Sequence, residues 1–181
     1  MLIPEHQKFI ARTRHWVETI VVGLNLCPFA RRELVNERVL FTVSDAITEE
    51  QLLMDLQSSL LALADNPAIE TTLLIHPHVL QDFDDYNQFL DIADALLGDM
   101  NLEGVYQIAS FHPDYQFADT EAGDARNYSN KSPYPTLHLL SEESLENAIA
   151  TTPDIDLIPE RNQALLNRIG ILKLQELLSN I

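Results

Sequence analysis

Two apolar segments of the chain end in the same dipeptide, His-Pro, and a helix-length segment separates them. They are residues 70–77 (ETTLLIHP) and residues 105–113 (VYQIASFHP). Proline cannot donate a hydrogen bond to a neighbouring strand, so each His-Pro marks the place where strand pairing stops. Two parallel strands joined by a helix place their carboxyl ends at the same edge of a sheet, where open α/β folds bind ligands. The sequence therefore predicts that His76 and His112 face one crevice.

The other segments alternate between strand and helix patterns. We expect strands at residues 38–43, 70–75, 105–111 and 136–140, and helices at residues 4–24, 48–65, 83–97, 141–150 and 159–177. Such alternation is typical of a layered α/β fold with a mainly parallel or mixed sheet. The element order also fits a thioredoxin-like core, and an open three-layer sandwich fits equally well. We expect a single α/β domain over residues 1–181, with an N-terminal helix and connector (1–35), a core (36–150) and an extra C-terminal helix (151–181).

The chain is strongly acidic, with 28 Asp and Glu against 11 Lys and Arg, and a formal net charge of −17. This field repels nucleic acid and anionic membrane surfaces, and we expect the chain to bind neither. The single cysteine, Cys27, excludes an internal disulfide framework and fits a reducing compartment. The first residues lack a signal-peptide pattern, and no apolar run reaches the length of a membrane span. We therefore expect a cytoplasmic protein.

The histidines that end the two strands are the first candidates for chemistry. His76 and His78 are two residues apart and would point the same way in extended backbone. Together with His112 and Asp114 they would supply nitrogen and oxygen ligands for a divalent metal such as zinc or manganese. Alternatively, His76 and His112 would be catalytic by proton transfer, with Asp114 as the orienting carboxylate. A third interpretation is that each histidine hydrogen-bonds a loop, and for His138, which lies mid-strand, we favour such a paired core role.

Residues 112–135 show neither helix nor strand periodicity. A loop of this length in a compact domain is usually functional or disordered, and its aromatic residues indicate a packed loop. Because positive charge is scarce in this chain, we assign substrate binding to Arg126 and Lys131 of this loop, together with Tyr134. Arg161, in the first turn of the last predicted helix, is instead expected to form an internal salt bridge. The chain has no Gly-rich phosphate-binding motif, which argues against the common modes of nucleotide binding.

Cys27 is a possible nucleophile. The segment at residues 27–30 (CPFA) resembles the redox motif of thioredoxin-like proteins, with Ala30 in place of the second cysteine. A thiolate would form there if Arg31, Arg32 or a helix N-terminus lowered the pKa of the thiol. Two observations weigh against this role: the motif precedes the first predicted strand, and free cysteines are commonly buried and inert.

Four segments carry a resemblance to a known family. They are residues 25–30 (NLCPFA), 73–77 (LLIHP), 107–117 (QIASFHPDYQF) and 132–140 (SPYPTLHLL). These segments resemble the signature blocks of an uncharacterised bacterial family, the domain of unknown function 1415. The resemblance covers nearly the whole chain and implies a single-domain bacterial protein. It implies no activity, cofactor or site residue.

Three functional hypotheses follow from the residues. The first is an enzyme, a hydrolase or group transferase, acting on a small anionic substrate at a histidine-based site where His76 and His112 either transfer protons or hold a metal. The second is a non-catalytic module that binds a metabolite or a metal in the same crevice. The third is an acidic adaptor that uses its charge to attract a basic protein partner. An apolar pocket with convergent polar groups would favour catalysis, whereas a flat acidic face would favour the adaptor.

Overall fold

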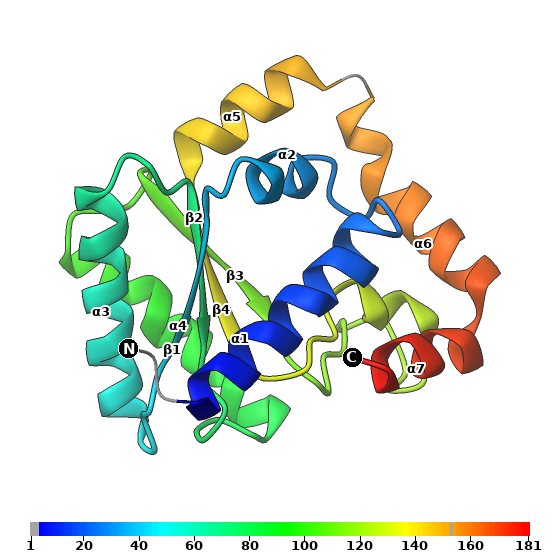
Figure 1. Cartoon of the computed structure of the whole chain (residues 1–181), viewed down its shortest axis with the longest axis horizontal. Helices are drawn as coiled ribbons and strands as arrows, with labels where there is room; N and C mark the ends of the chain where they lie inside the picture. Colours follow the sequence, from blue (N-terminus) through cyan, green and yellow to red (C-terminus); the bar gives the residue numbers. More distant parts are fainter. Residues whose placement is uncertain (1–3, 153) are drawn as a thin grey trace.

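The computed structural model describes residues 4–152 and 154–181 (Figure 1). The first part of the chain comprises helix α1 (Pro4–Trp16), the π-helical turn η1 (Val17–Val22), helix α2 (Ala30–Val35), strand β1 (Val39–Val43) and helix α3 (Glu49–Asp65). Strand β2 (Thr71–Ile75), helix α4 (Phe83–Asp99), strand β3 (Tyr106–Phe111) and the 3-10 turn η2 (Ala125–Ser129) follow. Strand β4 (Thr136–Ser141), helix α5 (Glu142–Thr151), the 3-10 turn η3 (Ile155–Leu157) and helices α6 (Ile158–Ile169) and α7 (Ile171–Ser179) complete the chain.

The four strands form one mixed sheet in the order β1-β2-β4-β3. Strands β1 and β2 are parallel, whereas β4 runs antiparallel to both of its neighbours, β2 and β3. Thr136 lies opposite Ile75 on one side and opposite Phe111 on the other. The carboxyl ends of β2 and β3 therefore lie at the same edge, which confirms the prediction for the two His-Pro ends. The sheet is mixed rather than mainly parallel, because β4 is inserted between the two strands.

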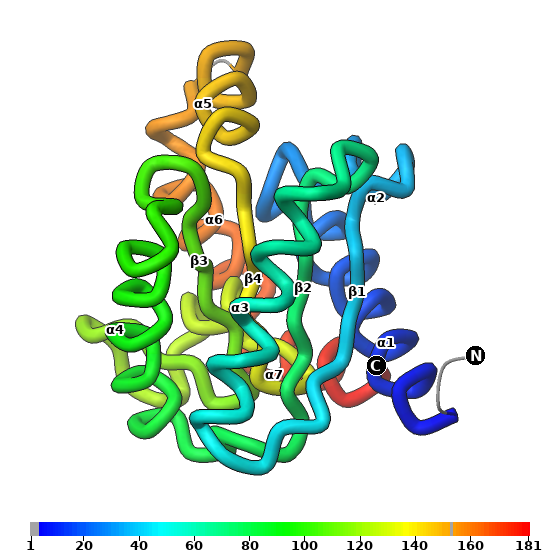
Figure 2. The backbone as a smooth tube through the Cα atoms, turned by 90° about the vertical axis from the view of Figure 1, so that its left-hand side faces the viewer, coloured from blue at the N-terminus to red at the C-terminus, as the bar shows by residue number. Residues whose placement is uncertain are grey.

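Helices α3 and α4 cover one face of the sheet (Figure 2). Consecutive residues of a strand point to opposite faces, so Leu74 faces this layer while Leu73 faces the other. The buried residues of this layer include Leu52, Leu56 and Leu60 of α3, Tyr86, Phe89 and Ala93 of α4, and Leu137 and Leu139 of β4. Their periodicity of three to four residues along each helix is the amphipathic pattern read from the sequence.

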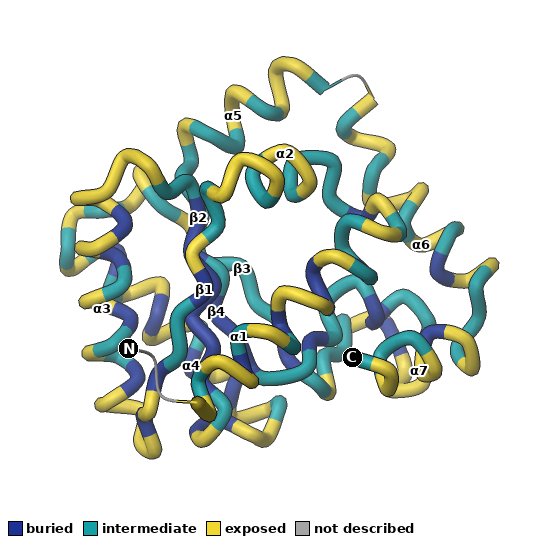
Figure 3. Tube along the Cα trace, in the orientation of Figure 1, coloured by how far each residue is buried: buried dark blue, intermediate teal, exposed yellow. Residues whose placement is uncertain are grey.

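The opposite face packs against α1, η1, α6 and α7. Its buried cluster contains Trp16, Val17, Ile20, Phe41, Leu73, Leu166 and Leu174. The result is a three-layer arrangement with helices on both faces of the sheet, which confirms the predicted α/β class. Figure 3 shows that α5 carries no buried segment, whereas α1 and α3 each contain buried positions.

Helix ends follow the capping signals in the sequence. Thr48 caps α3 by accepting a hydrogen bond from the backbone N–H of Gln51, and Asp82 caps α4 through Asp84 and Asp85. Gly170 has φ of +80°, a conformation that favours glycine, and separates α6 from α7, so the helix expected at residues 159–177 is divided in two. Among the described residues, none of the helices has the length and apolar character needed to traverse a bilayer.

Candidate functional site

His76 and His112 are both fully buried at the shared edge of the sheet. Their rings lie near the same phenol, that of Tyr86, with centroid separations of 5.7 Å for His76 and 5.0 Å for His112. The ring of Phe83 also contacts His112, at 5.4 Å. The two histidines therefore belong to one aromatic cluster beneath helix α4. They come together because β2 and β3 end at the same edge of the sheet.

Backbone groups occupy most of the hydrogen-bonding capacity of these imidazoles. His76 Nδ1 donates to the carbonyl oxygen of Val79 at 3.1 Å, and His112 Nε2 donates to that of Leu80 at 3.2 Å. The other nitrogen of His112 accepts from the backbone N–H of Asp114 at 3.0 Å. Carbonyl oxygens can only accept hydrogen bonds, so His76 carries its proton on Nδ1 and His112 carries its proton on Nε2. Within residues 4–152 and 154–181, the buried Nε2 of His76 has no hydrogen-bond partner.

Tyr86 joins the ends of β3 and β4. Its hydroxyl donates to the carbonyl oxygen of Thr136 at 2.9 Å and accepts from the backbone N–H of Phe111 at 3.1 Å. Burial lowers the pKa of His76 to about 4, lowers the pKa of His112 and raises the pKa of Tyr86. At neutral pH the cluster is therefore uncharged. Its contacts are those of a structural clamp that holds the segment after β2 against the end of β3.

His78 does not share the orientation of His76. The chain turns at Pro77 and His78, so the alternation expected for extended backbone does not apply, and His78 is exposed with its ring edge against Phe9. Asp114 contacts His112 through its backbone N–H. Across the described part of the chain, no group of three or more His, Cys, Asp or Glu side chains is placed to hold a metal ion. The proposed set of His76, His78, His112 and Asp114 is thus not assembled as a ligand cluster.

The contacts of Arg126 and Arg161 differ from those expected. The guanidinium of Arg126 forms ion pairs with Asp124 at 2.8 Å and with Asp119 at 2.9 Å. Arg161 instead donates to the backbone carbonyl oxygen of Asn25 at 3.0 Å. The internal salt bridge is therefore at Arg126, and Arg161 binds a carbonyl group just beyond the end of η1, where cations are electrostatically favoured.

The long loop is packed, as its aromatic residues predicted. Asn127 is fully buried at its centre, where its Oδ1 accepts from the backbone N–H of Phe117 at 3.1 Å and from Thr120 Oγ1 at 2.7 Å. Its Nδ2 donates to the carbonyl oxygen of Glu121 at 2.9 Å. The Asn127 side chain therefore hydrogen-bonds to three other residues of the same loop and holds the loop in a closed conformation.

The other predicted substrate-binding residues also have partners within the chain. The ammonium of Lys131 lies 5.3 Å from the centre of the Tyr128 ring, and the hydroxyl of Tyr134 accepts from Arg12 at 3.1 Å. Arg12 also donates to the carbonyl oxygen of Ile181 at 3.2 Å. Sequence reasoning missed Arg12, since a lone arginine on an amphipathic helix gives no signal of such a contact.

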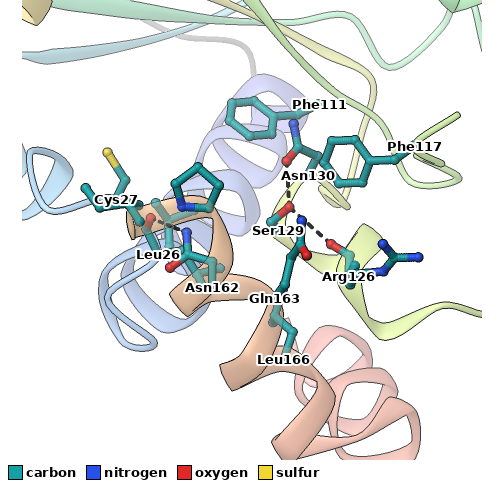
Figure 4. A pocket seen from close by; sticks show the side chains of 13 residues that line it. Leu26, Cys27, Phe111, Phe117, Arg126, Ser129, Asn130, Asn162, Gln163 and Leu166 are labelled. Atoms are coloured by element: carbon teal, nitrogen blue, oxygen red, sulfur yellow. Dashed lines mark hydrogen bonds between the residues drawn. The ribbon is translucent and has the colours of Figure 1, made fainter. Parts of the chain in front are cut away.

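A cavity of about 370 Å³ lies between the segment after η1, the end of β3, turn η2 and helix α6 (Figure 4). Its apolar walls include Val21, Leu26, Phe111, Phe117, Pro159 and Leu166. Cys27 and Arg126 also line it, so the structure brings two of the sequence candidates to one cavity. Neither histidine at the sheet edge lines it.

The amide side chains around the cavity support its walls. Asn162 Nδ2 donates to the carbonyl oxygen of Leu26 at 2.7 Å, which ties helix α6 to the segment that carries Cys27. Ser129 donates to Asn130 Oδ1 at 2.8 Å, and Asn130 Nδ2 donates to the carbonyl oxygen of Ser110 at 3.1 Å. In Figure 4, Cys27 and Asn162 stand on one side of the cavity, and the guanidinium of Arg126 extends away from them on the other. The interior is therefore mainly apolar.

The thiol of Cys27 is half-buried, and it has no hydrogen-bond partner within the described ranges. A catalytic cysteine ordinarily has a base within hydrogen-bond reach and a third group that orients that base. The structure places Cys27 on a cavity wall without such a pair among the residues it describes.

Comparison with known proteins identifies the family. A family model described as a protein of unknown function (DUF1415) matches residues 8–176. The chain belongs to this family. No curated protein and no solved structure gave a match. Membership of the DUF1415 family confirms the resemblance seen in the sequence.

Proposed function

We propose that this DUF1415 protein is a small-molecule binding protein whose ligand occupies the cavity that contains Cys27 and Phe111. The observation that carries this proposal is the cavity itself. Its volume of about 370 Å³ falls within the range of small-molecule sites, and its walls are mainly apolar with a few polar groups. The hydrogen bonds of Asn130 and Asn162 hold those walls in place without a ligand, as in sites that are largely pre-formed.

The charges around the cavity favour an uncharged ligand. Among the described residues, Arg126 supplies the one guanidinium that lines it, and this group is balanced by Asp124 and Asp119. The chain as a whole carries a net charge of −17. A small anion would meet repulsion rather than a free cation at this site. An apolar molecule gains free energy from burial of its surface against the aromatic and aliphatic walls. We also propose a reducing compartment, the cytoplasm, since the single cysteine has no partner for a disulfide within the chain.

The second candidate is an enzyme of the hydrolase or group-transferase class, and the observation that favours it is the thiol of Cys27 on the cavity wall. In that case the Cys27 sulfur would attack the carbonyl carbon of an ester held against Phe111, forming an acyl thioester while the alcohol leaves with the thiol proton. Binding is the better supported function because the buried histidines, His76 and His112, hydrogen-bond to backbone groups outside this cavity.

A cavity-blocking variant with a matched control tests the proposal. Gln163 is exposed on α6 and lines the cavity, whereas Asn167 is exposed on the same helix and does not. We expect Gln163→Trp to abolish the binding of uncharged fragments detected by ligand-observed NMR, and Asn167→Trp to leave it intact. Fragments that bind equally well to both variants would show that they do not occupy this cavity, and a screen without any hit on the parent protein would reject the proposal.

A further inference from the structure

One face of helix α6 forms a wall of the cavity. Pro159, Asn162, Gln163 and Leu166 recur every three to four residues, the spacing that brings side chains to one side of a helix, and all four line the cavity. Asn162 and Gln163 carry amide groups, which are the polar groups of this wall. The two amides have different contacts, and this difference decides which of them meets a ligand.

Asn162 belongs to the support of the wall. Its Nδ2 donates to the carbonyl oxygen of Leu26 at 2.7 Å. Its Oδ1 is buried and has no hydrogen-bond partner in the described part of the chain. The oxygen is therefore enclosed by protein atoms, and the amide nitrogen joins α6 to the segment that carries Cys27.

Gln163 has a side chain that the fold leaves free. It is exposed, and neither end of its amide has a hydrogen-bond partner among the residues that the structure describes. In Figure 4 this amide extends from α6 toward Ser129 of turn η2, and both residues line the same cavity. An amide presents one acceptor oxygen and two N–H donors. Gln163 therefore offers a donor and an acceptor that only water satisfies in the free protein.

Ser129 adds one acceptor to this wall. Its hydroxyl lies 2.8 Å from Asn130 Oδ1 and 3.2 Å from the carbonyl oxygen of Arg126. Both of these oxygens can only accept, so the hydroxyl is the donor in each contact. Within residues 4–152 and 154–181, no donor is directed at the lone pairs of Ser129 Oγ. Gln163 and Ser129 together form an uncharged polar end of the cavity, with two acceptors and one donor group.

We infer that this polar end selects an uncharged ligand with a carboxamide group on an apolar body. The ligand carbonyl oxygen accepts from Gln163 Nε2, one ligand N–H donates to Gln163 Oε1, and the other N–H donates to Ser129 Oγ. The donor and acceptor of each amide thus meet the acceptor and donor of the other. The apolar body lies against Phe111 and Phe117, which line the cavity. This inference rests on the proposed function, because it names the class of ligand and the group that selects it.

Two probes of nearly the same shape test the inference on the natural protein. Benzamide carries the carboxamide, and acetophenone keeps the carbonyl oxygen but has a methyl group in place of the NH₂ group. We expect benzamide to bind about ten times more tightly, the ratio that one or two net hydrogen bonds provide. The side-chain ¹H–¹⁵N resonances of Gln163 should also shift more with benzamide than with acetophenone.

A matched pair of variants then locates the selectivity. Gln163→Met keeps the length of the side chain but removes its donor and acceptor, and both Gln163 and the control position Asn167 are exposed on α6. We expect the affinity ratio to fall to about two or less in Gln163→Met, since only the contact with Ser129 remains. The control Asn167→Met should keep the ratio of the natural protein. An unchanged ratio in Gln163→Met would overturn the role of Gln163.

The outcomes separate this inference from the proposed function. Equal affinity of the two probes in the natural protein, with binding still blocked by Gln163→Trp, would overturn the carboxamide inference and leave the proposed function standing. Absence of binding by both probes would also overturn the inference. If, in addition, the fragment screen finds no other uncharged ligand, the proposed function is rejected as well.

Discussion

The imidazole of His76 is stacked on the phenol ring of Tyr86, with the ring centroids 5.7 Å apart and the planes inclined by 16°. Both side chains are fully buried, and each hydrogen-bonds to the backbone at the edge of the sheet. Because the His76 ring is neutral in the fold and no carboxylate of the described residues hydrogen-bonds to it, protonation would place an unpaired charge in the core. This relationship makes the stability of the fold sensitive to acid.

The first prediction concerns that acid sensitivity. The pKa of His76 is lowered to about 4 in the folded protein, against about 6.5 when unfolded, so the unfolded state binds more protons between these values. Stability is therefore complete above pH 6.5 and falls as the pH decreases toward 4. Between pH 6.5 and 5 we expect His76 to account for a loss of about 2 kcal/mol, at 1.36 kcal/mol per pH unit. Because burial also lowers the pKa values of His112 and His138, urea unfolding at a series of pH values measures their combined loss, which should be at least this large. An unfolding free energy that stays constant between pH 7 and 5 would contradict the prediction.

A second prediction compares two histidines close to this edge. His112→Ala removes a buried ring that contacts Tyr86 and Phe83 and leaves the Leu80 carbonyl oxygen without its imidazole donor. We expect it to lower the unfolding free energy by about 2–4 kcal/mol, from the lost packing and the lost hydrogen bond. His78→Ala removes an exposed ring and should cost less than about 1 kcal/mol. Chemical denaturation of both variants tests this difference, and equal stabilities would remove the structural role given to His112.

A third prediction isolates one hydroxyl group. Tyr86→Phe keeps the ring but leaves the Phe111 N–H without its acceptor and the Thr136 carbonyl oxygen without one donor. The expected cost is about 1–3 kcal/mol, the penalty for leaving buried polar groups unpaired. Tyr115→Phe is the control, since that ring also contacts Phe83 but is half-buried. Differential scanning calorimetry should show a lower melting temperature for Tyr86→Phe alone.

The fold could be predicted from local patterns because each pattern has a direct physical cause. The two His-Pro ends located one edge of the sheet, since proline ends strand pairing and β2 and β3 run in the same direction. The insertion of β4 between them could not be predicted, because sequence periodicity reports which face a residue occupies and does not report its neighbours in the sheet. The helix expected at residues 48–65 agrees with α3, whose first turn is fixed by a local hydrogen bond from the Gln51 N–H to Thr48.

The candidate site was less accessible to sequence reasoning. His76 and His112 were correctly placed at a common edge, but their rings turn inward to backbone carbonyl groups, which a residue type cannot reveal. The cavity with Cys27 joins segments more than 130 residues apart, as the contact between Asn162 and Leu26 illustrates. Such a site results from the packing of α6 against the start of the chain, and no motif within a single segment encodes it.

A fourth prediction concerns the long loop that forms one cavity wall. Asn127→Ala removes the acceptor of the Phe117 N–H and the donor to Glu121, and leaves Thr120 Oγ1 with the Phe117 carbonyl oxygen as its acceptor. We expect a loss of about 2–3 kcal/mol and faster amide exchange throughout residues 116–127, because these hydrogen bonds close the loop. The control variant Asn167→Ala, at an exposed position, should leave the unfolding free energy and the amide exchange of this loop unchanged. Unaltered exchange in Asn127→Ala would show that the aromatic contacts alone hold the loop.

The last prediction uses the single thiol of the chain to separate binding from catalysis. Cys27 lines the cavity and is half-buried, so alkylation with iodoacetamide adds a group that occupies part of the cavity. We expect the alkylated protein to lose the binding of uncharged fragments. Cys27→Ala should keep that binding and should be insensitive to iodoacetamide, since the chain has no other cysteine.

Cys27→Ala should also keep its stability within about 1 kcal/mol, as for most substitutions outside the core. Retained binding in Cys27→Ala is what a binding protein requires, because the apolar walls contributed by Phe111 and Leu166 are unchanged. If the natural protein instead forms a covalent adduct with a bound ester or thioester, detected by mass spectrometry and absent in Cys27→Ala, the thiol is a nucleophile and the enzymatic alternative replaces the binding function.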